Sequence, residues 1–375
     1  MIVRIRFLAA ATLAAVAACS APTATVAREQ DGRTVALDLT SGRPVVQAQI
    51  NGRGPYPMIF DTGAGAAVLL DSLERELGLE VRGQTPLGSP LGGRSPPVGD
   101  IVGLDTVSIG GVQMSDLQAV SINDNILPLR GARGVLGPAT IPDRIVEIDI
   151  SSGTLWIGPA PRHRITQWNR IGGRGQLEAT IQIGGVAIPA HIDTGDPGTI
   201  TLPRSFAARL PLRAPLRECC GMRTFDATRV ESLGELDTDA TISGSPIRLD
   251  VAEFADLPVA GIGSKALRGF TIIVDYAHRR WALVGAAEGP VVAQPAFGDF
   301  GARVMPEPDG AMAIFGLESG SRAEASGLRV GDRIVRINDS VVAATNPSVL
   351  REALAAPGAN IIVERGGATL ALVAR

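Results

Sequence analysis

The chain has 375 residues and a formal net charge of −3, from 35 Lys and Arg against 38 Asp and Glu. A balance so close to neutral excludes the basic footprint of a nucleic-acid-binding protein, so we expect no nucleic-acid partner. The chain is rich in Gly (45) and Pro (26), and its short apolar runs consist largely of Val and Ile. This composition favours many short strands joined by tight turns, in a chain long enough for two or three domains.

The first 19 residues have the layout of an export signal. Arg4 and Arg6 precede an apolar segment at 7–16, which is too short to cross a bilayer as a helix. Small residues follow this segment and lead to Cys19. We therefore expect residues 1–19 to direct the protein out of the cytoplasm.

The segment Val-Ala-Ala-Cys at 16–19 resembles the lipobox of bacterial lipoproteins. The resemblance implies cleavage before Cys19, lipidation of that residue and a flexible tether at 20–32. An ordinary cleavable signal is the alternative. A lipid would anchor the protein to a membrane without spanning it, and Ser20 after the Cys resembles the sorting pattern for the outer membrane. The expected location is the periplasm.

Neither cysteines nor histidines form a metal-binding pattern. Cys219 and Cys220 are adjacent, so they could form a strained vicinal disulfide or stay reduced. His163, His191 and His278 are scattered, without the paired spacing of a zinc site. We expect no metal and no cofactor.

A long pattern occurs twice, first at 45–79 and again at 177–212. Each copy has an alternating strand, a Gly-containing turn, a strand ending in Asp-Thr-Gly, an apolar strand and a short helix. The similarity continues at 132–158 and 259–285. A near-constant offset between the copies indicates a duplicated domain.

This duplication predicts the domain organisation. Each copy should form a small closed β unit, the first at 33–160 and the second at 161–286. A linker rich in Pro, Gly and Ala follows at 287–296, and the sequence at 297–375 has a different character.

The two Asp-Thr-Gly segments point to carboxylate chemistry. Two carboxyl groups about 3 Å apart cannot both ionise near neutrality, so they share one proton. The ionised member can then activate a water molecule while the protonated member polarises a carbonyl group. A Gly two residues after each Asp permits close approach of the two backbones, and the Thr hydroxyl can form hydrogen bonds across the axis.

The chain resembles the retropepsin-like aspartic proteases in their single-chain, bilobal form, over about 35–285. Gly134–Gly137 and Ala260–Gly263 resemble the second signature of this family, which packs beneath the active loop. The resemblance implies a mainly β fold of two closed barrels and a protein or peptide substrate. It implies the following site residues: Asp61 and Asp193 as the catalytic dyad, and Thr62, Gly63, Thr194 and Gly195 as the residues that orient it.

Asp196 departs from this family's pattern, because a small residue such as Ala64 is expected after the Gly. If its carboxylate pointed at the dyad, it would raise the pKa of the pair. If it faced solvent and capped the following turn, it would be harmless. The flap over the substrate is expected within 84–99, with a second wall near 219–225.

The sequence at 319–342 resembles a PDZ domain through Gly327-Leu328, Gly331-Asp332-Arg333-Ile334 and Ile337-Asn338. The resemblance implies a small α+β domain at 297–375 that binds a peptide or a protein C-terminus by adding it as a strand. The groove would lie between a strand around 301–305 and a helix at 347–355. The carboxylate-binding loop would consist of Phe297, Gly298, Phe300 and Gly301.

Together these patterns predict a lipid-anchored aspartic endopeptidase. The alternative is a non-catalytic peptide-binding protein with a degenerate protease cleft.

Overall fold

The structure is a computed structural model that describes residues 32–87, 98–124, 129, 131–173, 175–223, 228–293, 300–306, 311–342, 354 and 356–375. Cys19, the tip of the expected flap, Phe297, Gly298 and most of the expected helix at 347–355 lie outside the described residues. Within the described part, no helix is both long enough and apolar enough to span a membrane.

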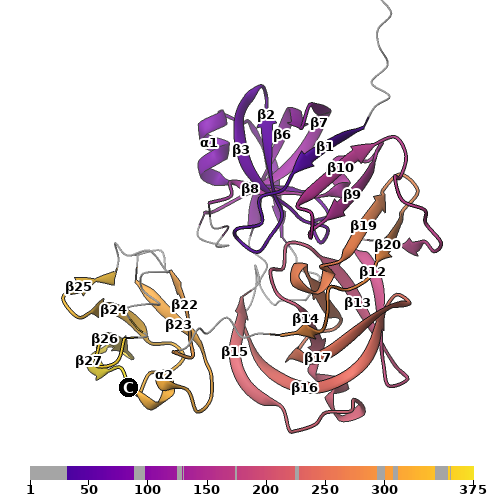
Figure 1. Cartoon of the computed structure of the whole chain (residues 1–375). Coiled ribbons are helices and arrows are strands. Elements are labelled where there is room, and N and C mark those ends of the chain that lie inside the picture. Colours follow the sequence, from indigo (N-terminus) through magenta and orange to yellow (C-terminus); the bar gives the residue numbers. More distant parts are fainter. Residues whose placement is uncertain are drawn as a thin grey trace, which may run out of the picture. The chain divides into compact units, whose positions relative to one another are not determined.

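The protein is mainly β, with 54% strand and 9% helix, and it contains two closed six-stranded barrels (Figure 1). This confirms the predicted duplicated fold. The first barrel runs in the order β2-β3-β8-β4-β7-β6 and closes because β2 also pairs with β6. Its strands are β2 (Val45–Ile50), β3 (Arg53–Phe60), β8 (Gly134–Leu136), β4 (Ala67–Leu70), β7 (Val112–Ile122) and β6 (Val98–Ile109).

The second barrel repeats this order as β12-β13-β18-β14-β17-β16 and closes through the β12–β16 pairing. In β12, the sequence Leu-Glu-Ala-Thr-Ile-Gln-Ile alternates strictly between buried and exposed positions, as a strand with one face on the core requires. The strands of this barrel are β12 (Leu177–Ile183), β13 (Val186–Asp193), β18 (Ala260–Gly263), β14 (Ile200–Pro203), β17 (Ser245–Ala255) and β16 (Thr228–Ile242).

Each barrel carries one matching edge strand. β5 (Val81–Pro86) pairs with β6 in the first copy, and β15 (Arg217–Arg223) pairs with β16 in the second. These two hairpins contain the segments expected to form the walls of the cleft. A short strand, β21 (Val291–Val292), runs parallel to β17 within the segment expected to be a linker.

A third sheet joins the two copies, in the order β1-β10-β9-β19-β20-β11. Its central pair is antiparallel and places Ile148 opposite Ile272, and both side chains are fully buried. One hydrophobic core continues through both barrels and this sheet. The strands are β1 (Arg33–Ala36), β10 (Thr154–Gly158), β9 (Ile145–Asp149), β19 (Phe270–Asp275), β20 (Arg280–Gly285) and β11 (Asn169–Arg170).

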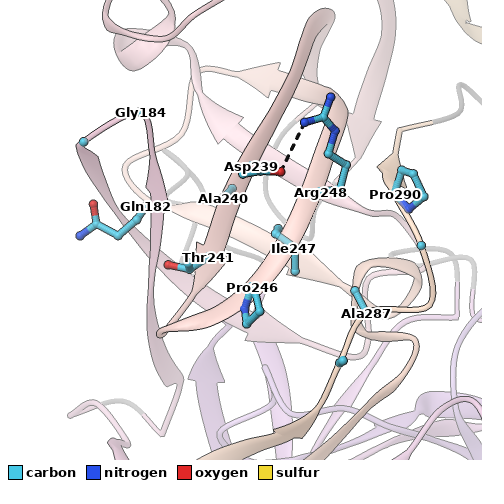
Figure 2. Close-up of a pocket in the computed structure, with 13 residues that line it drawn as sticks. Gln182, Gly184, Asp239, Ala240, Thr241, Pro246, Ile247, Arg248, Ala287 and Pro290 are labelled. Atoms are coloured by element: carbon cyan, nitrogen blue, oxygen red, sulfur yellow. Dashed lines mark hydrogen bonds and ion pairs between the residues drawn. The ribbon is translucent and has the colours of Figure 1, made fainter.

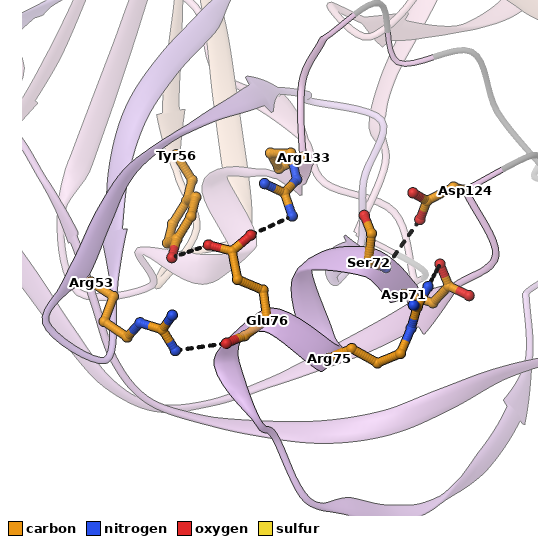
Figure 3. Close-up of polar contacts among 8 residues, drawn as sticks. All are labelled: Arg53, Tyr56, Asp71, Ser72, Arg75, Glu76, Asp124 and Arg133. Atoms are coloured by element: carbon orange, nitrogen blue, oxygen red, sulfur yellow. Dashed lines mark hydrogen bonds and ion pairs between the residues drawn. The ribbon is translucent and has the colours of Figure 1, made fainter.

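The expected helix of the first copy is α1 (Asp71–Leu77), which ends at Gly78 in the left-handed conformation, with φ 68°. Figure 3 shows how Glu76 of this helix is held: the Tyr56 hydroxyl donates to it at 2.9 Å and the Arg133 guanidinium at 2.8 Å. Tyr56 therefore has a structural role, since it connects barrel strand β3 to helix α1.

In the second copy, the expected helix is a single 3₁₀ segment, η2 (Arg204–Arg209). Pro203 and Pro211 bracket it so closely that no longer helix fits between them. Two further 3₁₀ turns, η1 (Pro138–Thr140) and η3 (Ser264–Leu267), follow the second signature of each copy.

The C-terminal unit is a separate small sheet, in the order β22-β23-β24-β26-β27, with its own core. The buried carboxylate of Asp332 receives two hydrogen bonds from Arg365, at 2.6 and 2.7 Å. The elements are β22 (Ala302–Pro306), β23 (Met312–Leu317), α2 (Arg322–Ala325), β24 (Arg333–Ile337), β25 (Ser340–Val341), β26 (Asn360–Arg365) and β27 (Ala368–Val373).

Candidate active site

The two Asp-Thr-Gly segments lie at equivalent ends of paired parallel strands. β3 runs parallel to β8, and the Asp61 N–H donates to the Leu136 carbonyl oxygen at 2.8 Å. β13 runs parallel to β18 in the same way, with Asp193 opposite Gly263. Each Asp therefore leaves a strand that is fixed on both sides by the barrel.

The Gly that ends each second signature packs against an active loop, as the resemblance implied. A Cβ atom on Gly137 would lie 2.5 Å from the Asp61 carbonyl oxygen. One on Gly263 would lie 2.6 Å from the Gly198 carbonyl oxygen. Any side chain at either position would displace the loop that carries the carboxyl group.

Thr62 and Thr194 link the two loops through four hydrogen bonds. The Thr62 hydroxyl accepts from Thr194 N–H at 3.1 Å and donates to the Ile192 carbonyl at 3.0 Å. The Thr194 hydroxyl accepts from Thr62 N–H at 3.0 Å and donates to the Phe60 carbonyl at 2.8 Å. Both side chains are at most 1% exposed. This arrangement fixes the two loops relative to each other about a local twofold axis.

The carboxyl groups of Asp61 and Asp193 lie against the Gly residues of the opposite loops. A Cβ atom on Gly63 would lie 3.0 Å from the Asp193 Cγ, and one on Gly195 would lie 2.5 Å from the Asp61 Cγ. Asp61 Oδ1 accepts the N–H of Gly63 at 2.6 Å and that of Gly195 at 3.2 Å. The two carboxyl groups are therefore close enough for each to shift the pKa of the other.

Burial and nearby groups raise the pKa values of both carboxyl groups. Burial raises the pKa of Asp61, but the N–H groups that donate to it favour its charged form. Burial and the charge of Asp61 raise the pKa of Asp193 well above its ordinary value. The pair titrates as one unit, and the repulsion between the two charges favours a state with a single shared proton.

Asp196 combines the two alternatives considered from the sequence. Its Oδ1 accepts the Gly198 N–H at 2.7 Å, so it caps the turn after the second active loop. It is also half-buried, and its own N–H donates to Asp193 Oδ1 at 3.1 Å. Burial and the charge of Asp193 raise the pKa of Asp196 to about 6. It is therefore both a turn cap and an electrostatic neighbour of the dyad.

Two contacts to the second active loop were not identified from the sequence. The Ser264 hydroxyl donates to the Thr194 carbonyl at 2.8 Å. The Arg43 Nε–H donates to the Gly195 carbonyl at 2.6 Å. The sequence could have indicated Ser264, because it directly follows the second signature, whereas Arg43 lies between β1 and β2 and matches no pattern.

The remaining candidates lie outside the two Asp-Thr-Gly segments. Cys219 and Cys220 both lie in β15, beside a register shift. Phe300 is buried, and the Gly301 carbonyl accepts the Glu318 N–H at 2.9 Å. Within the described ranges, no group of three or more His, Cys, Asp or Glu side chains is placed to hold a metal ion.

A concavity of about 640 Å³ lies at another end of the second barrel (Figure 2). The hairpin ends of β12–β13 and β16–β17 line it together with residues 286–290, and Arg248 donates to its cross-strand neighbour Asp239 at 3.3 Å. No residue of the Asp-Thr-Gly loops lines it, so it is separate from the candidate active site.

Residues 46–138 match the family model described as aspartyl protease. The matched segment contains the first Asp-Thr-Gly and ends directly after the second signature of the first copy. No curated protein matches the chain. The family match supports aspartic protease activity in general and implies a protein substrate.

Proposed function

We propose that the protein is an aspartic endopeptidase whose catalytic dyad is Asp61 and Asp193. The observation that carries this proposal is the pair of carboxyl groups, one from each barrel, that lie against the opposite loops, with these loops locked together by Thr62 and Thr194. Gly63 and Gly195 leave the space that this approach requires.

The proposed mechanism uses a water molecule and one shared proton. The ionised Asp61 takes a proton from the water as its oxygen attacks the scissile carbonyl carbon. Asp193 donates its proton to the carbonyl oxygen, which gives a tetrahedral diol. Collapse of the diol breaks the C–N bond: one diol hydroxyl returns its proton to Asp193 as the acid product forms, and the proton on Asp61 passes to the leaving amine. The dyad then returns to its singly protonated state without a covalent intermediate.

The substrate would lie between the β5–β6 and β15–β16 hairpins. Both hairpins extend from the barrel edges at equivalent places in the two copies. This symmetry supports an extended peptide as the substrate, because such a peptide can contact both walls through its backbone.

We further propose that the C-terminal unit is a PDZ domain and that a lipid on Cys19 anchors the protein in the periplasm, at the outer membrane. The ordered sequence signature and the small sheet with its own core support the first point. The lipobox-like segment supports the second. Mass spectrometry of the mature N-terminus tests the anchor, since an unmodified or differently cleaved N-terminus would contradict it.

Cleavage of an unfolded protein by wild type, Asp61→Asn and Asp193→Asn tests the dyad across a range of pH. Both substitutions should abolish cleavage, because each removes one half of the shared acid–base pair. Asp105→Asn, at an exposed position of β6, is the matched control. Cleavage that survives either dyad substitution would exclude the mechanism. If wild type cleaves at no pH, the chain is instead a peptide-binding protein with a degenerate cleft.

A further inference from the structure

We propose that Arg43 is a positioning residue whose charge offsets the third carboxylate, Asp196, and thereby sets the pH range in which the dyad works. This inference rests on the proposed protease function. It concerns a residue that lies outside both Asp-Thr-Gly segments.

Arg43 reaches the second active loop from the other copy. It lies just before β2 of the first barrel, and its Nε–H donates to the Gly195 carbonyl at 2.6 Å. The neighbouring Gly42 has φ 78°, and a Cβ atom there would lie 3.2 Å from the Pro197 Cβ. The segment before β2 therefore packs on the loop that carries Asp193 and Asp196.

The internal duplication shows what is special about this contact. With the offset of 132 that relates Asp61 to Asp193, Arg43 corresponds to Gly175 and Asp196 corresponds to Ala64. Gly175 approaches the first active loop in the same manner, since a Cβ atom there would lie 3.4 Å from the Gly65 Cα. One loop pair thus has Gly and Ala where the other has a base and an acid. The acid Asp196 and the base Arg43 therefore occur together at one loop pair, and the equivalent loop pair has neither.

The electrostatic surroundings of Asp196 support compensation. The charge of Asp193 opposes ionisation of Asp196, while Arg43 and Arg303 favour it. Arg43 also lowers the pKa of Asp61. Arg303 donates to the buried Glu231 at 3.3 Å. Among the described residues, the titratable and charged groups that interact with Asp196 include the carboxyl groups of Asp193, Glu231 and Glu253 and the guanidinium groups of Arg43 and Arg303.

The inference has a definite consequence for the pH profile. Removal of the Arg43 charge makes ionisation of Asp61 and Asp196 harder, so the bell-shaped activity profile should move to higher pH. Removal of the Asp196 charge should move it to lower pH. Removal of both should return it close to the wild-type position, because the two charges act on the same pair.

The test measures kcat/KM against pH, with an unfolded protein as substrate, for Arg43→Gln, Asp196→Asn and the double variant. Asn keeps a side-chain oxygen for the Gly198 N–H. Each single substitution should displace the acidic limb by roughly one pH unit, which is about a tenfold change on that limb. Arg43→Lys should restore the wild-type position, since it keeps the charge. Arg53→Gln, which removes an Arg that donates to the Glu76 carbonyl at 2.7 Å, is the matched control.

Two results would overturn the inference. One is an Arg43→Gln profile that superposes on wild type. The other is a double variant whose acidic limb stays at the Asp196→Asn position, since the Arg43 charge would then have no effect on the pair. If Arg43→Gln does not fold, the Asp196→Asn profile still decides, because an unmoved acidic limb would show that this carboxylate does not reach the dyad.

A second readout separates failure of this inference from failure of the protease proposal. If wild type cleaves nothing, the proposed function fails, and the charge pair is tested by the urea midpoint of the same variants between pH 4 and pH 8. Arg43 favours the ionised form of Asp196, so its stabilising effect should be present above a pKa of about 6 and lost on acidification. It should vanish in the Asp196→Asn background. A pH-independent effect would overturn the pairing.

Discussion

Replacement of Thr194 by Val should weaken the connection between the two barrels. Val has nearly the same shape as Thr, but it lacks the hydroxyl that accepts from Thr62 N–H and donates to the Phe60 carbonyl. Both backbone groups would lose their partner at a position with 0% exposure. Because each unsatisfied buried group costs about 1–3 kcal/mol, the free energy of unfolding should fall by roughly 2–6 kcal/mol.

Urea denaturation followed by tryptophan fluorescence measures this change, because Trp281 lies fully buried in the joining sheet. The midpoint should fall by roughly 1 M or more. Thr194→Ser is the matched control, since it keeps the hydroxyl and loses only one methyl group, at a cost of about 1 kcal/mol. If the Val variant is no less stable than the Ser variant, the hydroxyl does not hold the loops together and the reasoning is refuted.

Three further predictions concern the carboxyl groups and the packing. Gly195→Ala and Gly63→Ala should both lower kcat, and Gly195→Ala should lower it more, because its Cβ would approach a carboxyl carbon to 2.5 Å rather than 3.0 Å; equal kcat values would contradict this. Asp332→Ala should destabilise the C-terminal unit by about 3–5 kcal/mol, since it leaves the Arg365 guanidinium without its buried partner; calorimetry should show the loss, and an unchanged transition would refute it. Burial and a neighbouring carboxylate raise the pKa of Glu231 to about 8, so the folded state favours its protonated form and loses stability as pH rises from about 4.5 to 8. Glu231→Gln should therefore raise the urea midpoint at pH 8 and leave it unchanged at pH 4; an equal effect at both pH values would count against the assignment.

The duplication made the barrels predictable from the sequence, because equivalent landmarks recur at a fixed offset. Asp149 and Asp275 lie at equivalent places in the repeated segments 132–158 and 259–285, but the sequence does not predict that their strands pair. They lie in β9 and β19, the strands that pair to join the copies. Pairing between distant strands depends on which edges remain free after each barrel closes, and the pattern along one strand does not reveal that.

The parts of the candidate site that lie within a short stretch of sequence were predictable. The Asp-Thr-Gly segments contain the residues that meet at the axis, so the crossed Thr contacts could be foreseen. The contact of Arg43 with Gly195 spans 152 positions and depends on how the segment before β2 folds over the opposite copy. Asp196 lay between these cases: its turn-capping role is local, but its burial depends on the whole second barrel.

The joining sheet also constrains the order in which the chain can become active during its synthesis. The first barrel is complete once β8 has been made, but β9 then has one unpaired edge until β19 emerges more than a hundred residues later. An exposed strand edge invites pairing with other chains, so the nascent first half would need shielding during this interval. The same half holds only one of the two carboxyl groups and lacks the Gly195 N–H that Asp61 accepts. Under the proposed mechanism, a half-made or truncated chain would therefore lack a complete dyad and could not cleave the proteins around it.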